Sequence, residues 1–373
     1  MKIGIFTDTY FPQVNGVTFT IDLWKQKLEE MGHEVCIYYP AGKYKPGKNE
    51  FPFRSFEFKF YQGYRVAIPL GIEKKARDLD LVHIHGLFPM AIAGLRVSQK
   101  YKLPKILTYH TPADEYIVYM TQRKALKNTL MKLYNYWEKK LLNSCMLVTC
   151  PSNVIKERLV SKGVKDVVVL SNGVDLGLFH AVDSGNFRKK FSIPAGKTLG
   201  FCGRFGYEKH IEDFIGIADW FDGELLIAGK GPAEEHYKKL AEGKKNVKFI
   251  GFMKREELRE FYSALDLFIF PSTAETQGLV ALEAMACGKP VVGANRLALK
   301  NTIQNGYNGY LYESGNLEDL KQKIELAYKN LDALSANSLE YVKQHSVDCS
   351  MKKLVGLYET ILKDNGKVRC GGR

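Results

Sequence analysis

Residues 268–292 read FIFPSTAETQGLVALEAMACGKPVV and are the most informative segment of the chain. An apolar run leads into a polar loop, and a helical segment then opens near Gly278 and stops at Gly288 and Pro290. A second apolar run begins at Val291. The order strand, loop, helix, strand predicts one repeating unit of a parallel α/β sheet.

The same alternation extends outward in both directions along the chain. Short, nearly continuous apolar runs alternate with segments of helical periodicity, such as 234–241 and 255–264, as a parallel sheet covered by helices on both faces requires. The first series of runs comprises residues 2–6, 35–39, 81–85, 106–109, 146–150 and 167–170, and the second comprises residues 198–202, 224–228, 247–250, 267–270 and 291–292. The sequence therefore predicts an α/β protein with two doubly wound, Rossmann-like domains facing each other across a cleft.

The domain boundaries are predicted from a polar stretch at 180–197 that contains Gly185, Pro194 and Gly196. At 373 residues the chain is long enough for two cores of roughly 150 residues each. We expect an N-terminal domain over residues 1–180, completed by a C-terminal helix at 346–363, and a C-terminal domain over residues 190–345.

The composition is that of a globular chain, with 45% apolar and 25% charged residues. The longest stretches without Asp, Glu, Lys or Arg, 81–95 and 141–155, are shorter than the roughly 18 apolar residues of a membrane-spanning helix. Asp8 interrupts the apolar start, so no signal peptide is predicted and we expect a cytoplasmic protein. Seven cysteines without a Cys-x-x-Cys pair indicate neither a disulfide framework nor a zinc site.

The formal net charge of +13 is concentrated in the first half of the chain. Residues 1–180 contain 26 Lys and Arg against 16 Asp and Glu, whereas residues 181–373 contain 28 against 25. This excess suits nucleic acid, an anionic membrane surface or an acidic substrate. Because the sequence has no recognisable RNA- or DNA-binding motif, we expect no nucleic-acid partner.

The loop before Gly278 has the chemistry of an anion site. The free backbone amides and the dipole of a helix start favour a diphosphate, and glycine allows close backbone approach. Glu275 would lie nearest the group beyond the diphosphate, and Glu283 could accept hydrogen bonds from ribose hydroxyls, an order that fits a sugar nucleotide. The alternative is that Glu275 is an ordinary charge at a helix start and that Glu283 is solvated or ion-paired.

The sequence resembles the large retaining glycosyltransferase family four, whose members have the GT-B fold. The donor-site signature of that family is two glutamates separated by seven residues, the spacing of Glu275 and Glu283. Further similar motifs cover nearly the whole chain in order: FTDTYFP (6–12) before NGV (15–17), GHEV (32–35), VHIHG (82–86), NGVD (172–175), GR (203–204) with EK (208–209), and AGKGP (228–232).

The resemblance implies a fuller donor site. Arg204 and Lys209 would neutralise the charge that develops on a departing nucleotide diphosphate, where the alternative is two solvated basic residues. No dense Asp cluster or Asp-x-Asp motif is present, so we expect neither a metal nor another cofactor. The predicted catalytic residues are His110 and Glu275, and the predicted donor-binding residues are Gly16, Arg204, Lys209, Thr276, Gln277, Gly278, Leu279 and Glu283.

Gly16 lies in the first strand-to-helix loop, which the similar family brings to the donor phosphates, although Asn15-Gly16 alone marks any tight turn. After the lysine, family members often have Gly where this chain has His210. If a positive φ is needed there, His costs more than Gly, unless the loop is helical instead.

His110 follows an apolar strand and is expected to face the cleft. A lone histidine in this position is usually structural, but the resemblance implies a hydrogen bond from His110 to the donor sugar, without a role as base. His83 and His85 alternate along one strand and could suggest a metal, yet no further ligand cluster accompanies them. We interpret these two histidines as structural.

The acceptor is predicted from two basic, aromatic segments. In residues 123–140, six basic residues accompany Leu126, Leu130, Leu133 and Trp137 at helical spacing, as in a helix on an anionic membrane surface or in an ordinary helix packed on its own domain. Residues 43–77 form a second patch with Phe51, Phe53, Phe56, Phe58, Phe60 and Tyr61. Together the two segments favour an acceptor at a lipid interface.

The segment 273–278, together with His110-Thr-Pro and Tyr116, is similar to bacterial diacylglycerol α-glucosyltransferases. We therefore expect a retaining, metal-independent hexosyltransferase with UDP-glucose as donor and a lipid such as diacylglycerol as acceptor. Its N-terminal domain would be the acceptor and membrane side, on the inner face of the cell membrane. Transfer to a soluble sugar or polysaccharide, a nucleotide-sugar epimerase and a nucleic-acid binder are the alternatives.

Overall fold

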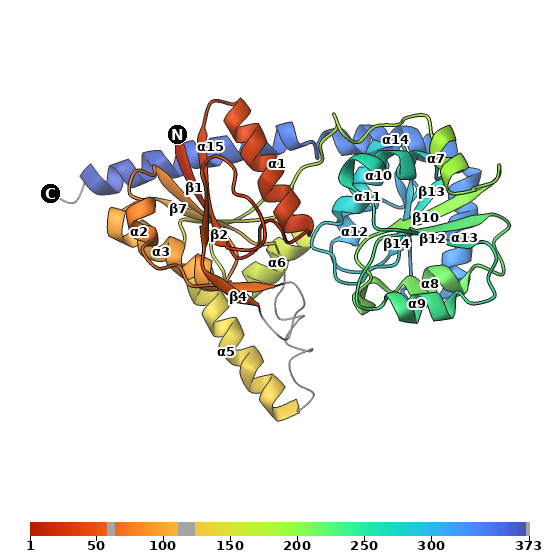
Figure 1. Ribbon diagram of the computed structural model, residues 1–373, viewed down its shortest axis with the longest axis horizontal. Helices are drawn as coiled ribbons and strands as arrows, with labels where there is room; N and C mark the ends of the chain where they lie inside the picture. The colour runs from red at the N-terminus through yellow and green to blue at the C-terminus, as the bar shows by residue number, and fades with distance from the viewer. Residues whose placement is uncertain (58–63, 111–123, 371–373) are drawn as a thin grey trace. The chain divides into compact units, whose positions relative to one another are not determined.

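The computed structural model describes residues 1–57, 64–110 and 124–370 and confirms the predicted fold class. The chain divides into two compact units. The first consists of Met1–Asn172 with Val347–Arg373, and the second is Gly173–Ser346. Each unit contains a parallel sheet covered by helices on both faces (Figure 1).

The first unit is built on a seven-stranded parallel sheet with the order β3-β2-β1-β6-β7-β8-β9. Its strands are β1 (Lys2–Thr7), β2 (Glu34–Pro40), β3 (Glu50–Phe53), β6 (Leu81–His85), β7 (Lys105–Thr108), β8 (Leu147–Cys150) and β9 (Val167–Val169). Alternating residues of a strand supply opposite faces, and in β2 Ile37 and Tyr38 accordingly belong to different cores.

Helices cover both faces of this sheet. One core lies under α1 (Gly16–Glu30) and α15 (Val347–Cys370), and Figure 1 shows these two helices beside each other. The opposite core lies under α2 (Ile72–Lys75), α3 (Pro89–Tyr101), α5 (Lys124–Leu142) and α6 (Asn153–Ser161). The last helix of the chain therefore packs on the first sheet, through buried side chains at helical spacing: Val347, Met351, Leu354, Tyr358 and Ile361.

The second unit is built on a six-stranded parallel sheet with the order β12-β11-β10-β13-β14-β15. Its strands are β10 (Thr198–Cys202), β11 (Glu224–Ala228), β12 (Val247–Gly251), β13 (Leu267–Phe270), β14 (Val291–Ala294) and β15 (Gly309–Tyr312). Its helices are α7 (Gly185–Lys190), α8 (Ile211–Gly216), α9 (Glu234–Leu240), α10 (Arg255–Ser263), α11 (Leu279–Ala286), α12 (Leu299–Thr302), α13 (Leu317–Lys329) and α14 (Leu331–Lys343).

The structure moves the predicted domain boundary. Residues 173–180, which we expected in the first domain, belong to the second unit because Val174 and Phe179 are fully buried in its core. The expected linker at 180–197 is partly folded, since it contains α7 and buries Phe187 and Ile193 in the same core. These apolar residues were too widely spaced to stand out in a polar stretch.

The aromatic patch at 43–77 is partly a strand that the pattern did not reveal. Phe53 is buried and Phe51 packs against the same core because both belong to β3. Phe56 is 53% exposed on β4 (Ser55–Glu57), which pairs with β5 (Arg65–Ala67) as an antiparallel hairpin. Phe58, Phe60 and Tyr61 lie outside the described residues. Of the three phenylalanines of this patch that the structure describes, Phe51, Phe53 and Phe56, Phe56 is therefore the exposed one.

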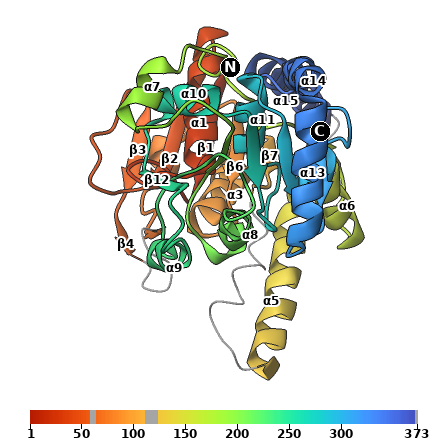
Figure 2. The same cartoon turned by 90° about the vertical axis from the view of Figure 1, so that its right-hand side faces the viewer.

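The helix α5 extends away from the other helices and strands of its unit (Figure 1 and Figure 2). Its C-terminal half is anchored, because the indole N–H of Trp137 donates to Leu87 O over 3.1 Å and the buried Glu138 accepts from Tyr109 and Lys162. Across the three described segments, no helix has the length and apolarity to span a bilayer.

Candidate active site

The start of α11 is shaped by Gly278, which is its N-cap residue. Gly278 has φ 83°, a left-handed conformation that glycine adopts without the cost of a side chain. A Cβ at this position would also lie 2.9 Å from a methyl group of Leu299. No side chain caps the helix here, and Ala281 N donates to Gly278 O, so the amides that precede Ala281 remain available to an anion.

Glu275 lies just before this helix and pairs with Lys209. The Lys209 ammonium contacts Glu275 Oε1, and the hydroxyl of Ser272 donates to the same oxygen over 2.7 Å. Both side chains of the pair are mostly buried, with 18% of Lys209 and 15% of Glu275 exposed. Two residues that the sequence predicted separately thus form one charged group at the edge of the sheet.

The loop that carries Lys209 is a short 3-10 helix, Tyr207–Lys209, followed by His210. His210 has φ 47° and ψ 42°, the left-handed conformation for which family members often use glycine. The chain therefore bears the cost of a non-glycine residue at this turn. Thr273 N donates to Glu208 O over 3.0 Å, which connects this loop to the loop of Glu275.

Arg204 is exposed in the loop after β10, next to a tightly packed glycine turn. A Cβ on Gly229 would lie 1.9 Å from the carbonyl oxygen of Gly203, so the two backbone segments pack too closely to admit a side chain at position 229. Gly203 N donates to Ala228 O and Phe205 N to Lys230 O. The backbone that carries Arg204 is thereby fixed, although its side chain reaches solvent.

Glu283 is buried and ion-paired, which is the alternative that we left open for it. Arg255 Nη2 lies 3.1 Å from Glu283 Oε1, and the hydroxyl of Tyr262 donates to Oε2 over 3.1 Å. Only 5% of the Glu283 side chain is exposed. Burial raises the pKa of Glu283, while Arg255 and the Tyr262 hydrogen bond oppose that shift.

The other predicted donor residues of this loop differ in exposure. Gln277 is buried, and its carbonyl oxygen accepts a 2.7 Å hydrogen bond from Thr302. Thr276 and Leu279 are half-buried, on either side of the turn. The Gln277–Thr302 bond fixes the backbone immediately before Gly278, which supports a pre-formed turn.

Gly16 and His110 belong to the first unit, whereas the other predicted site residues belong to the second. Gly16 is the exposed first residue of α1, where the Asn15 side chain accepts from Thr18 N over 2.9 Å. His110 follows β7 and is half-buried. Tyr116 lies outside the described residues.

His110 is hydrogen-bonded to His85, a contact that the sequence did not indicate. His110 Nε2 and His85 Nδ1 lie 2.8 Å apart, and the two rings stack with centroids 5.0 Å apart. Burial lowers the pKa of His110 to about 3. The pKa of His85 is also lowered well below its ordinary value, by burial and by its two histidine neighbours. Both rings are therefore neutral at physiological pH.

His83 completes a row of three neighbouring imidazoles. One ring nitrogen of His83 is 2.6 Å from the hydroxyl of Tyr358, and the other is 2.6 Å from that of Thr108. Both nitrogens are thus already used in the hydrogen-bond network. Within residues 1–57, 64–110 and 124–370, no group of His, Cys, Asp and Glu side chains is arranged to hold a metal ion.

Asp8 is a further buried group beside this cluster that the sequence did not single out. Its carboxylate accepts from Phe88 N and Met90 N at the start of α3 over 2.9 and 3.0 Å. Burial raises its pKa to about 6 despite these hydrogen bonds. Asp8 thereby holds the segment that follows His85, and its place in the motif at 6–12 was the available signal.

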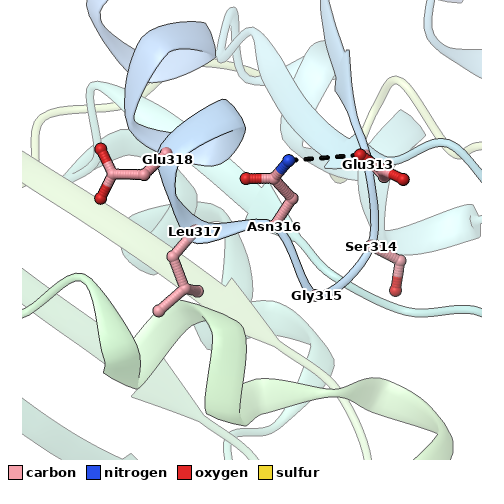
Figure 3. Close-up of a pocket in the computed structure, with 6 residues that line it drawn as sticks. All are labelled: Glu313, Ser314, Gly315, Asn316, Leu317 and Glu318. Carbon is pink, nitrogen blue, oxygen red and sulfur yellow. Dashed lines mark hydrogen bonds between the residues drawn. The ribbon is translucent and has the colours of Figure 1, made fainter.

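A shallow hollow in the second unit lies elsewhere (Figure 3). Asn316 Nδ2 donates to Glu313 Oε2 over 3.2 Å across it. Its lining residues are Glu313, Ser314, Gly315, Asn316, Leu317 and Glu318, among which none is a predicted donor residue. Two carboxylates and no cation make it a poor site for a nucleotide diphosphate.

Two parallel-sheet units with this charged loop at the edge of the second sheet define a glycosyltransferase of the GT-B fold. The family model described as Glycosyltransferase Family 4 matches residues 14–178, and the model described as Glycosyl transferases group 1 matches residues 183–344. The chain belongs to glycosyltransferase family 4, and it is a hexosyltransferase.

Characterised relatives cover most of the chain. The alpha-monoglucosyldiacylglycerol synthase of Streptococcus pneumoniae is 32% identical over 338 residues, which are 84% of this chain and 75% of the relative. The enzyme of the same name from Acholeplasma laidlawii is 26% identical over 98% of this chain and 99% of its own. The solved structure of Anabaena HepE in complex with UDP-glucose matches 96% of this chain and 100% of its own with a TM-score of 0.78 at 18% identity, which shows the shared fold.

Proposed function

We propose that this enzyme transfers glucose from UDP-glucose to diacylglycerol with retention of the anomeric configuration. The observation that carries the proposal is the Lys209–Glu275 ion pair beside the uncapped start of α11. A cation, a carboxylate and free amides where two loops meet suit the successive parts of a sugar nucleotide, which are the diphosphate and the sugar.

The diphosphate is the part that this loop would stabilise most. As the bond between the sugar and the phosphate breaks, negative charge develops on the phosphate oxygen. Lys209, Arg204 and the amides of Gly278 and Leu279 would neutralise that charge without a metal ion. Glu275 would then orient the sugar hydroxyls, and the predicted contact of Gly16 with the phosphates would come from the first unit.

Retention follows if leaving group and acceptor share one face of the sugar. The acceptor hydroxyl forms a bond to the anomeric carbon as the phosphate oxygen departs, and this oxygen takes the hydroxyl proton. Fixed dipoles stabilise the oxocarbenium-like charge. His110 would hydrogen-bond the sugar rather than act as base, which agrees with the burial that keeps its imidazole neutral.

The nucleoside end of the donor is assigned to Glu283. Each oxygen of Glu283 already has one protein partner, Arg255 or Tyr262, and a carboxylate oxygen can accept a second hydrogen bond. A ribose hydroxyl would therefore bind to a carboxylate that is held in place before the donor arrives. Glu283 can therefore keep its ion pair with Arg255 and still accept a hydrogen bond from the ribose, as predicted.

The choice of glucose and diacylglycerol is supported by the relatives from Streptococcus pneumoniae and Acholeplasma laidlawii, both of which are alpha-monoglucosyldiacylglycerol synthases. It is also supported by α5, where Leu133 and Tyr136 are 63% and 69% exposed and Lys132, Lys139 and Lys140 are exposed beside them. Trp137 faces inward instead, so the predicted apolar stripe is divided between the core and solvent.

Such a surface fits the headgroups of an anionic membrane, and we place the enzyme there as a peripheral protein on the cytoplasmic face.

The proposed donor and acceptor are tested by a product screen. Purified enzyme is given UDP-glucose, UDP-galactose or GDP-mannose with diacylglycerol in anionic vesicles, phosphatidylinositol or soluble sugars, and products are identified by mass spectrometry. Monoglucosyldiacylglycerol from UDP-glucose supports the proposal, and a product on soluble sugars alone rejects the lipid acceptor. An altered sugar nucleotide without acceptor would instead indicate an epimerase.

A further inference from the structure

The tautomers of the His85–His110 pair determine what His110 can offer a ligand. Because both imidazoles are neutral, one ring nitrogen of each carries a proton and the other carries a lone pair. The 2.8 Å contact between His85 Nδ1 and His110 Nε2 needs one donor and one acceptor. Two arrangements satisfy it, with the shared proton on His85 or on His110.

The surroundings of His85 distinguish these arrangements. His85 is 1% exposed, and its Nε2 is buried without a hydrogen-bond partner among the described residues. If His110 donated, His85 would have to carry its proton on this buried Nε2, leaving an orphaned N–H. Orphaned N–H groups are rarer in protein interiors than under-satisfied acceptors. The proton between the rings therefore belongs to His85 Nδ1.

The position of the His85 ring is also fixed by its neighbours. Its centroid lies 4.0 Å from that of His83 and 5.5 Å from that of Trp24. Trp24 is itself held by a 2.6 Å hydrogen bond from its indole N–H to Asn172 O. A ring packed between two fixed rings can direct the ring to which it is bonded.

We propose that His85 is a positioning residue that donates from Nδ1 to His110 Nε2 and thereby makes His110 a hydrogen-bond donor through Nδ1. With Nε2 occupied as acceptor, the proton of His110 lies on the nitrogen that remains for a ligand. That nitrogen can donate to a sugar hydroxyl oxygen and cannot take up a proton. The inference rests on the proposed function only in placing the donor sugar at His110.

The first test reads the tautomers directly and needs no activity. In full-length protein labelled with ¹⁵N-histidine, long-range proton–nitrogen NMR spectra distinguish protonated from unprotonated ring nitrogens, and substitutions of single histidines assign the eight residues. We expect His85 and His110 both to be protonated at Nδ1. Protonation of His110 at Nε2 would overturn the proposal, whatever the donor or acceptor of the enzyme.

The second test separates positioning from general structure. His85→Asn keeps an N–H donor near the position of Nδ1, and His85→Phe keeps the volume without the donor. Misplacing a reacting group costs about 10- to 100-fold in rate, so His85→Phe should lower kcat by about that factor with little change in KM, and His85→Asn should restore most of it. Tyr358→Phe, which removes a bond from the same cluster but leaves the pair intact, should keep the His110 tautomer.

The outcomes separate this inference from the proposed function. If His110→Ala abolishes turnover but His85→Phe does not change it, His85 does not position His110. If neither variant changes turnover, His110 does not contact the donor and the positioning role falls with that assignment. Should His85→Phe fail to fold, the spectrum of the unaltered protein and the Asn variant still decide the question.

Discussion

The ammonium of Lys209 contacts the carboxylate of Glu275 across 66 positions of sequence, at the edge where β10 and β13 lie side by side. Ser272 donates to the same carboxylate oxygen and the centroid of the Phe270 ring lies 5.9 Å from the ammonium, so the pair is held by groups from β13 and the loop that follows it. This charged group is the centre of the proposed donor site.

Substitution of either partner should lower turnover strongly. Loss of a group that stabilises transition-state charge costs about 100- to 1000-fold in kcat, so we expect losses of that size for Lys209→Ala and Glu275→Gln. Lys238→Ala removes an exposed ion pair with Glu234 in the same unit and is the matched control. Near-native rates for both site variants, in steady-state transfer assays, would remove the pair from the active site.

Activity should not depend on a divalent metal. The charge of the leaving group is neutralised by Lys209, Arg204 and helix amides in our account, so treatment with excess EDTA should leave the rate unchanged and added Mn²⁺ should not raise it. The measurement is the initial transfer rate before and after chelation, with magnesium-free vesicles. Loss of turnover on chelation that Mn²⁺ restores would show that Lys209, Arg204 and the helix amides do not suffice and that the leaving group also needs a metal ion.

The Glu283–Arg255 pair should contribute to stability as well as to donor binding. Breaking a buried ion pair by removing one partner costs about 3–5 kcal/mol, and Arg255→Met is expected near the lower end because 20% of Arg255 is exposed. Adding Glu283→Gln should recover part of the loss, because the unpaired buried charge disappears. Urea denaturation of the single and double variants measures this, and additive effects would argue against the pairing.

The histidine cluster should make the first unit sensitive to acid. The pKa of His83 is lowered well below its ordinary value by burial and by His110, so folding favours its neutral form. Its contribution is present above an unfolded pKa of about 6.5 and is lost as the pH falls below it, by about 1.4 kcal/mol per pH unit. The unfolding free energy of the unaltered protein should therefore decrease more steeply between pH 6.5 and 5 than that of His83→Gln. Asp8, whose pKa is raised to about 6, is present in both proteins, so its titration does not affect the difference between them. Equal slopes would mean that His83 is charged in the folded state.

Membrane binding should depend on the exposed side of α5. Leu133, Tyr136 and Lys140 follow helical spacing and are all exposed, so Leu133→Asp with Lys140→Glu should abolish sedimentation with anionic vesicles by removing apolar and electrostatic contacts together. Tyr207→Asp, at an exposed aromatic residue of the second unit, is the control. Unchanged sedimentation would place the membrane contact elsewhere.

The parallel sheets were predictable because their strands are continuous apolar runs, and every predicted strand is present in the structure. Four short strands, β3, β4, β5 and β15, were missed for physical reasons. Residues of β3 and the β4–β5 hairpin lie among Lys, Gly and Pro, and β15 is a four-residue segment, Gly309–Tyr312, that begins with glycine. Their pairing depends on neighbours that local pattern does not reveal.

The site shows the same limit at residue level. Lys209 and Glu275 were each predicted, but their contact depends on how two loops meet. His85 was interpreted as structural because the alternation of histidines along a strand does not reveal that His85 contacts His110, which follows β7. The burial of Glu283 had a signal that we did not use, since α11 is apolar on all sides and therefore lies inside its unit.

Titration calorimetry of UDP-glucose into the unaltered protein and into Lys209→Ala measures whether Lys209 binds the diphosphate of the donor. We predict measurable binding to the unaltered protein and affinity weaker by about 10- to 100-fold in the variant, because one charge-assisted contact to the diphosphate is lost. Equal affinity in the two proteins, or no binding of any sugar nucleotide to the unaltered protein, would contradict the account.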